Sequence, residues 1–300
     1  MASTFKRQLR HRIEYVFLRV LMWIVQRVSL KTAHRIAGGL GRGAFSIIRI
    51  RRRVTLDNLR MAFPEKSEKE LREIALGAYR NFAKMMLEFI RFPVMDKETV
   101  LSLSTIEGEE NVDWVLKNGK GAVMVAGHFG NWELMGAFLA QKGYPVSFLV
   151  GRQKNRLVDD LMNRYREGMG IHLIHMGVAV RGVIKALRSN EWVAMLADQD
   201  AHEEGVFVDF MGRKASNHQG PAVFALRTGA PIIFGSAIRQ PDGRHRMVAE
   251  LLRFDELTEV TPENIRVVTQ AYTNLLEKMV RQYPDQWFWM HRRWKTPPPQ

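Results

Sequence analysis

The chain has 300 residues, which is long enough to bury a substantial core as one large domain or two small ones. Hydrophobic residues make up 46% of it and charged residues 25%, so a disordered chain is excluded. The formal net charge of +14 predicts an anionic partner such as nucleic acid, an anionic lipid surface or an acidic protein, and the absence of cysteine excludes a disulfide framework, a thiolate metal site and a cysteine nucleophile.

The N-terminal segment, residues 1–50, is predicted to form membrane-associating helices. Two basic, apolar helices are expected over residues 5–50, and no cleavable signal is evident. The most apolar stretch, Ile13–Val28, is interrupted by four polar or charged residues, namely Glu14, Arg19, Gln26 and Arg27. This pattern favours a helix lying on a membrane with arginines at its edges over a spanning helix, while an ordinary amphipathic core helix is the third possibility.

The N-terminal region also contains a glycine-rich stretch and a cluster of arginines. The glycine-rich stretch Gly38–Gly43 has no strand before it and the wrong spacing for a dinucleotide loop, so it predicts close packing between helices. The cluster Arg49–Arg53 suits anionic headgroups, although a solvated face is the alternative.

The rest of the chain, residues 51–300, is predicted to be one α/β domain. Ser67 and Glu70 form a capping box that opens a helix running to about Phe92. Strands are expected at 121–126, 145–150, 171–174, 192–197, 206–211, 231–238 and 247–254, and helices at 131–141, 155–168, 180–189, 218–228 and 262–282. This alternation predicts a mostly parallel or mixed central sheet flanked by helices.

One short segment combines a base, an acid and the end of a strand. Residues 127–133 read GHFGNWE and follow the strand predicted at 121–126. His128 is expected on the turn and Glu133 early in the next helix, at the strand end where ligands bind in parallel sheets. A carboxylate that accepts a hydrogen bond from one imidazole nitrogen leaves the other nitrogen as a base. The segment therefore predicts a general-base pair of His128 and Glu133, beside a helix N-terminus that can stabilise an oxyanion.

The GHFGNWE segment resembles the signature of the bacterial lipid A late acyltransferases, the lauroyl and myristoyl transferases of the lysophospholipid acyltransferase superfamily. It is a tighter form of the HX4D/E motif shared with glycerol-phosphate acyltransferases. Further blocks resemble that family in its order along the chain: Arg52–Glu65, the set Arg152, Asn155, Arg166 and Gly170, the DQD block Asp198–Gly212, and Trp289–Lys295. Met211, where the family usually has Phe, and the weak N-terminal apolar span are the departures.

The resemblance implies an O-acyltransferase at the cytoplasmic face of the inner membrane. Its donor would be an acyl-carrier-protein thioester and its acceptor a hydroxyl of an anionic, phosphorylated lipid, a lipid A precursor. Direct transfer needs a base and oxyanion stabilisation but no covalent intermediate, and we expect no cofactor and no metal site. The sequence agrees, since it has neither a cysteine nor a GxSxG elbow.

The resemblance also implies functional residues. His128 and Glu133 would be catalytic, and the substrate-binding residues would be Asn131, Arg152, Asn155, Arg166, Asp198 and Asp200. Arg166 is expected to orient a phosphate through its planar guanidinium group. For Asp198 and Asp200, support of His128 or of an arginine is one interpretation and turn capping is another.

Other interpretations remain open at this point. The acceptor is either a lipid A precursor or another glycolipid or amino lipid. The pair Asp198 and Asp200 also resembles the DxD of metal-dependent glycosyltransferases, which would make the protein a lipid glycosyltransferase. Nucleic acid is not an expected partner, since no nucleic-acid motif is present. The aromatic and basic segment Trp287–Trp294 predicts either a membrane contact or a docked C-terminus.

Overall fold

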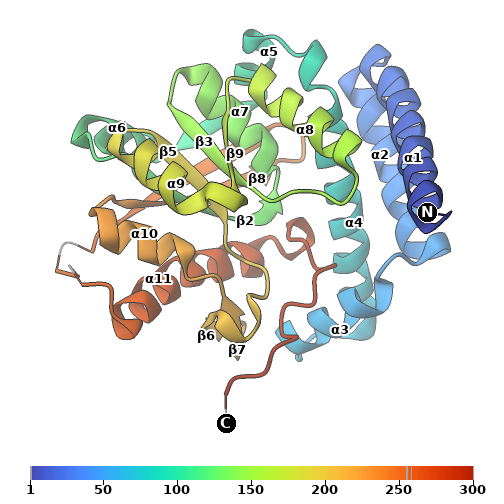
Figure 1. The fold of residues 1–300 in the computed structure, drawn as a ribbon. Coiled ribbons are helices and arrows are strands. Elements are labelled where there is room, and N and C mark those ends of the chain that lie inside the picture. The colour runs from blue at the N-terminus through green and yellow to red at the C-terminus, as the bar shows by residue number, and fades with distance from the viewer. Residues whose placement is uncertain (1, 255, 258, 300) are drawn as a thin grey trace.

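The computed structural model describes residues 2–254, 256–257 and 259–299 (Figure 1). Over these residues a seven-stranded sheet has the order β1-β9-β8-β2-β5-β3-β4. Its strands are β1 (Ser104–Glu107), β2 (Ala122–Gly130), β3 (Val146–Val150), β4 (His172–His175), β5 (Trp192–Leu196), β8 (Ile232–Arg239) and β9 (His245–Leu252). All neighbours are parallel except β8 and β9, so the sheet is mixed, as the sequence predicted.

Helices cover both faces of this sheet (Figure 1). They are α3 (Arg52–Ala62), α4 (Glu68–Ile90), α5 (Lys97–Ser102), α6 (Glu109–Asn118), α7 (Trp132–Lys142), α8 (Arg156–Gly168), α9 (Ala179–Arg188), α10 (Gly220–Thr228) and α11 (Pro262–Gln282). A small antiparallel hairpin of β6 (Val206–Phe210) and β7 (Arg213–Asn217) lies outside the sheet. The predicted capping box is confirmed, because Ser67 accepts from the Glu70 amide and Glu70 accepts from the Ser67 amide.

Several elements of the structure were not predicted from the sequence, namely helices α3, α5 and α6 and strands β1 and β7. Most are short, and α6 ends at a left-handed Gly119 after only ten residues. Elements of this length carry too few apolar positions to show a clear period, and packing on the neighbouring sheet stabilises them instead.

The N-terminal helices α1 (Ala2–Arg27) and α2 (Leu30–Gly43) pack against the domain at α4 and α8. Met22 and Val25 of α1 are buried there, while a row of large apolar side chains on the same helix faces outward. This exposed row comprises Leu9, Ile13, Val16, Phe17, Val20, Trp23 and Ile24. None of the helices in the described ranges combines the length and the apolar character that crossing a bilayer requires.

The C-terminal segment docks on the domain. Trp287, Trp289 and Met290 are each less than 7% exposed, and Asn58 of α3 donates to the Trp289 carbonyl oxygen at 2.9 Å. The predicted membrane contact of Trp287–Trp294 is therefore wrong for these buried side chains, because their apolar surface already lies in the core. The docked C-terminus, the other possibility, is confirmed.

The glycine-rich stretch on α2 generates a testable prediction. A Cβ at Gly41 would lie 2.7 Å from the Arg80 backbone on α4, whereas a Cβ at Gly39 would meet nothing within 4 Å. Gly41→Ala should therefore push the helices apart and lower the free energy of unfolding by about 1–3 kcal/mol. Gly39→Ala, the matched control, should raise it by about 0.5–1 kcal/mol through helix propensity. Denaturant unfolding of both variants measures this, and equal effects would contradict the close packing.

Candidate active site

His128 lines a largely apolar chamber of about 630 Å³. Glu133, Arg166, Gln199 and Phe288 also line it. Seven methionines contribute to its wall: Met85, Met86, Met124, Met135, Met162, Met176 and Met195. Methionine side chains are flexible and polarizable, so this wall can adapt to a long apolar ligand.

The fold brings His128 and Asp198 to the same level at the edge of the sheet. Strands β2 and β5 are parallel neighbours, and Ala126 is in register with Leu196. Each of the two functional residues follows its registered residue by two positions, so both emerge at the carboxyl ends of adjacent strands. The distance between His128 Nδ1 and Asp198 Oδ1 is 2.7 Å.

The Asp198 carboxylate is buried and held by protein donors. Besides the His128 ring, the His128 backbone amide and the Trp287 indole N–H donate to its Oδ2 at 2.7 Å each. Burial alone would raise the pKa of Asp198, but the neighbouring His128 and these hydrogen bonds lower it to about 2. An ionised carboxylate can only accept, so Nδ1 of His128 carries the proton and Nε2 is the available base.

This geometry corrects the predicted pair of His128 and Glu133. Glu133 accepts from Arg166 instead, with Nη2 at 2.6 Å from Oε1 and Nε at 3.0 Å from Oε2. Glu133 is on the first turn of α7 and points toward α8, whereas the ring nitrogen Nδ1 of His128 faces the end of β5. The predicted hydrogen bond from His128 to Glu133 is therefore wrong, and the acid beside the base is Asp198.

The same ion pair changes the expectation for Arg166. Its Nε and Nη2 donate to Glu133 and its Nη1 donates to Asn163 at 3.1 Å, so the guanidinium fork is already occupied by protein. The side chain is only 14% exposed but lines the chamber. The structure thus places Arg166 as a partner of Glu133, and its predicted contact with a phosphate stays a prediction.

Both ends of the Asn131 side-chain amide form hydrogen bonds with other residues of the protein. Its Oδ1 accepts from the Leu134 amide and caps α7, and its Nδ2 donates to Glu88 at 2.5 Å. Glu88 is buried on α4 and also binds Arg239 of β8 and His34 of α2. This buried cluster, which the sequence analysis missed, connects α2, α4 and the end of β2 that bears His128, since β2 extends to Gly130 and His128 lies in the strand rather than on the predicted turn. Asn131 is completely buried and does not line the chamber, and its predicted contact with a substrate stays a prediction.

The other predicted substrate-binding residues lie in different places. Asn155 caps α8 and donates to the His11 carbonyl oxygen of α1 at 2.9 Å, so it connects α8 to α1, and its predicted contact with a substrate stays a prediction. Asp200 accepts from the His202 amide and from Thr296, which places it under the C-terminal segment. Arg152 is exposed, next to Gly151 and Gln153, which line the chamber.

Three residues at the site, Trp287, Phe288 and Gln199, were not assigned to it from the sequence. Trp287 donates to Asp198, and the Phe288 amide donates to the His128 carbonyl oxygen at 3.0 Å, so the C-terminal segment pairs with the end of β2 that bears His128. Gln199 Nε2 lies 3.4 Å from His128 Nε2. Only the DQD block gave a signal for Gln199, and the contact of Trp287 spans 89 positions of sequence.

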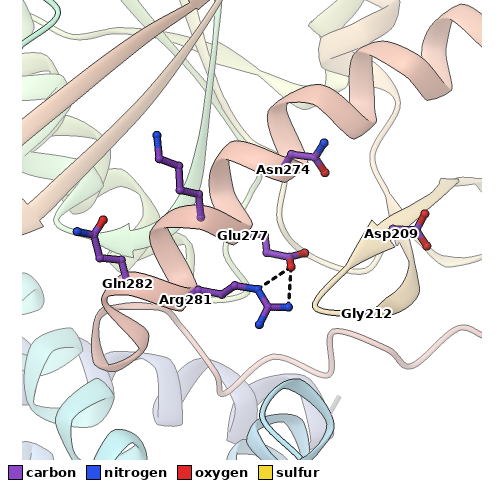
Figure 2. A pocket seen from close by; sticks show the side chains of 7 residues that line it. Asp209, Gly212, Asn274, Glu277, Arg281 and Gln282 are labelled. Carbon is purple, nitrogen blue, oxygen red and sulfur yellow. Dashed lines mark hydrogen bonds and ion pairs between the residues drawn. The ribbon is translucent and has the colours of Figure 1, made fainter.

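A second hollow, of about 750 Å³, lies between the β6–β7 hairpin and α11 (Figure 2). Figure 2 shows Arg281 pointing to Glu277, and their charged groups are 2.7 Å apart. Lys278, which also lines it, pairs with Glu250 at 3.5 Å. Apart from Gly212, the residues that line it are polar or charged, and they include no histidine, so this hollow lacks the imidazole that the chamber offers.

Comparisons with known proteins agree with one another. The model of the family described as bacterial lipid A biosynthesis acyltransferase matches residues 2–296. A lipid A biosynthesis lauroyltransferase of Escherichia coli is 26% identical, with 93% of this chain and 90% of the relative covered. A lipid A biosynthesis myristoyltransferase of the same organism is 24% identical, covering 88% and 79%. A phosphatidylinositol mannoside acyltransferase of Mycolicibacterium smegmatis is 25% identical, covering 74% and 72%.

The buried Glu88 cluster generates a prediction about stability. Glu88→Gln would leave the Arg239 guanidinium buried without its counter-charge, so the free energy of unfolding at pH 7 should fall by about 3–5 kcal/mol. Glu73→Gln, on an exposed position of the same helix, is the control and should stay within about 0.5 kcal/mol. Chemical denaturation measures both, and a neutral Glu88→Gln would show that the cluster adds nothing to stability.

The same cluster and Asp198 determine how stability depends on pH. Arg239 and the His34 hydrogen bond outweigh burial and lower the pKa of Glu88 well below its ordinary value. Carboxyl groups with depressed pKa values stabilise the fold above their unfolded pKa. We therefore expect stability to fall below about pH 4, as Asp198 titrates toward its pKa of about 2, and to fall less steeply in Glu88→Gln.

Proposed function

Because this chain belongs to the bacterial lipid A biosynthesis acyltransferase family, we propose that it transfers a fatty acyl chain from an acyl-carrier-protein thioester to a hydroxyl of a lipid A precursor. The observation that carries the proposal is the 2.7 Å contact between His128 and the buried Asp198 at the end of a methionine-lined chamber. The site therefore combines a base with space for an apolar chain.

In the proposed reaction, Nε2 of His128 accepts the proton of the acceptor hydroxyl as its oxygen attacks the thioester carbonyl carbon. Asp198 stabilises the imidazolium ion that forms, since its charge lies next to Nδ1–H. The tetrahedral intermediate then collapses, the carbon–sulfur bond breaks, and the imidazolium returns the proton to the departing thiolate. The N-terminus of α7 begins close to His128, and its dipole favours negative charge there.

The chamber supports a fatty acyl chain as the transferred group. Its aromatic and methionine lining would remove the chain from water, which is worth about 0.8 kcal/mol per buried CH₂. The Glu133–Arg166 pair lies at the side of this chamber, with both side chains mostly buried. We propose that the pair fixes α7 relative to α8 and so keeps the reacting groups in position.

Another class of acceptor lipid is a close alternative to a lipid A precursor. The phosphatidylinositol mannoside acyltransferase is as similar to this chain as the lipid A enzymes are, so another phosphorylated glycolipid is the second candidate. The amount of chain covered favours lipid A, since the lauroyltransferase match extends over 93% of this chain. Mass spectrometry of membrane lipids from cells with and without the protein separates the two acceptors.

A metal-dependent lipid glycosyltransferase is the alternative from another class. Asp198 and Asp200 would have to bind the cation, but every oxygen of both carboxylates accepts a hydrogen bond from the protein. We therefore propose acyl transfer without a metal. Loss of activity in a chelator, with rescue by Mg²⁺ or Mn²⁺, would favour the glycosyltransferase.

The proposed mechanism predicts the effect of substitutions at the base and its partner. His128→Ala and Asp198→Asn should each lower kcat by roughly 10²-fold or more, as expected for the loss of a general base or of the group that orients it. Steady-state transfer from an acyl-carrier-protein thioester to a lipid A precursor measures this. A near-normal Asp198→Asn beside an inactive Glu133→Gln would restore Glu133 as the partner of His128.

We further propose that α1 holds the protein on the cytoplasmic face of the inner membrane. Phe17 is 73% exposed and Trp23 57%, and α1 carries several arginines around its apolar row. An interfacial helix of this kind binds through apolar burial and attraction to anionic headgroups.

Vesicle binding tests this role of α1. Phe17→Ser with Trp23→Ser should weaken binding to vesicles that contain phosphatidylglycerol, because the exposed apolar surface is removed. Val260→Ser with Val267→Ser, which removes exposed apolar side chains elsewhere, is the control. Wild-type binding should also weaken as salt is added. Equal sedimentation of the α1 variant and the control would place the membrane contact outside α1.

A further inference from the structure

Two segments near the candidate active site contain basic residues and no acidic ones. Residues 146–158 contain Arg152, Lys154 and Arg156, and residues 168–190 contain Arg181, Lys185 and Arg188. All six side chains are exposed, and none forms an ion pair within the part of the chain that the structure describes. In a chain with 31 acidic residues, many surface cations elsewhere pair with carboxylates, as Arg60 does with Glu68.

The sheet brings these two segments together at the opening of the chamber. Strands β3 and β4 are parallel neighbours, with Val150 in register with His175. The next residues, Gly151 and Met176, leave the sheet side by side, and a Cβ on Gly151 would lie 3.3 Å from the Met176 sulfur. Both residues line the chamber and are exposed, so they form part of its rim.

Helix α9 extends this basic surface away from the rim. Arg181, Lys185 and Arg188 are spaced by four and three residues, so they share one face of the helix. The helix runs from the carboxyl edge of the sheet, after β4, back to the amino edge, before β5. Figure 1 shows α9 and α1 well separated across the molecule, so the basic surface runs away from the exposed apolar row of α1.

Two apolar side chains are exposed near these cations, Met176 on the rim and Val180 at the start of α9. Met176 is 60% exposed and Val180 is 52% exposed. A small apolar centre surrounded by charge is the usual anatomy of a protein interface, in which methionine and arginine are enriched. An interfacial membrane helix by contrast presents a continuous apolar face, such as the row on α1.

We propose that the rim and α9 form the docking surface for the acidic acyl carrier protein that delivers the thioester. This inference rests on the proposed function and adds where the donor binds. Unpaired cations on segments 146–158 and 168–190 complement an acidic partner and would steer its approach. Met176 and Gly151 lie where the pantetheine arm must enter to bring the thioester to His128.

The surface is tested with the charge-reversal variant Arg181→Glu with Lys185→Glu. These residues lie on the exposed face of α9 and do not line the chamber, so the chemistry should be unchanged. We expect KM for the acyl-carrier-protein thioester to rise about tenfold or more with kcat nearly constant. Turnover of the same acyl chain presented as a pantetheine thioester should match that of the wild type, because this donor lacks the acidic protein.

The matched control is Lys117→Glu with Lys120→Glu, which makes the same change of net charge at the amino edge of the sheet. It should leave KM for the carrier-bound donor within about twofold of the wild-type value. Equal increases in KM for the control and the α9 variant would show an effect of net charge alone and would overturn the assignment. An increase in KM for the lipid acceptor alone would also overturn it, since α9 would then bind the acceptor.

Direct binding separates this inference from the proposed function. Unacylated holo acyl carrier protein should bind the wild-type chain, with an affinity that falls as salt is added, and should bind the α9 variant more weakly. If the wild type transferred no acyl group from any donor, the proposed function would fail while the binding result still decided the docking surface. Equal binding by the α9 variant and the wild type would overturn the inference.

Discussion

The arrangement of the site depends on the contact between His128 and the buried Asp198 carboxylate. Asp198 is 3% exposed and accepts from the His128 ring, the His128 amide and the Trp287 indole. Removing a charge from water is costly unless donors replace the lost solvation, so this carboxylate is stable only when three separate parts of the chain meet around it. Strands β2 and β5 and the C-terminal segment are therefore coupled through one anion.

A second buried anion, Glu88, connects this site to the rest of the molecule. It binds Arg239 of the sheet, His34 of α2 and Asn131, which caps α7. Asn131 is three residues from His128, so two hydrogen bonds at Glu88 connect α2 to the end of β2 that bears His128. In the proposed function α1 contacts the membrane, and α1 packs in the same apolar cluster as α2 and α4, so this network would connect the membrane-bound helix to the position of the base.

Two parts of the molecular surface suit two different kinds of partner. The apolar row on α1 suits a lipid surface, whereas the basic rim and α9 suit an acidic protein. The chamber is lined by His128 and, at its rim, by Gly151 and Met176. A protein that joins a soluble donor to a lipid acceptor needs both kinds of surface beside one cavity. The high positive charge, which the composition alone could only link to an anionic partner, thus serves two partners in this proposal.

The sequence by itself determined the α/β class, most of the strands and helices around the site, and the position of His128 at the end of a strand. These features are local: an apolar run, a capping box and a glycine turn are visible within a few residues. It also supplied the family resemblance through GHFGNWE, which the family match over residues 2–296 confirmed.

The sequence left open whether Asp198 supports His128, and the tertiary structure decided which carboxylate His128 contacts. Glu133 is five positions away and Asp198 is 70, yet strand register puts Asp198 at 2.7 Å while the helical turn directs Glu133 toward Arg166. The docking of Trp287 on Asp198 and the meeting of four segments at Glu88 have the same origin. Such contacts join residues far apart in the chain, and the pairing of strands and the packing of helices and the C-terminal segment determine them, which no local pattern of side chains encodes.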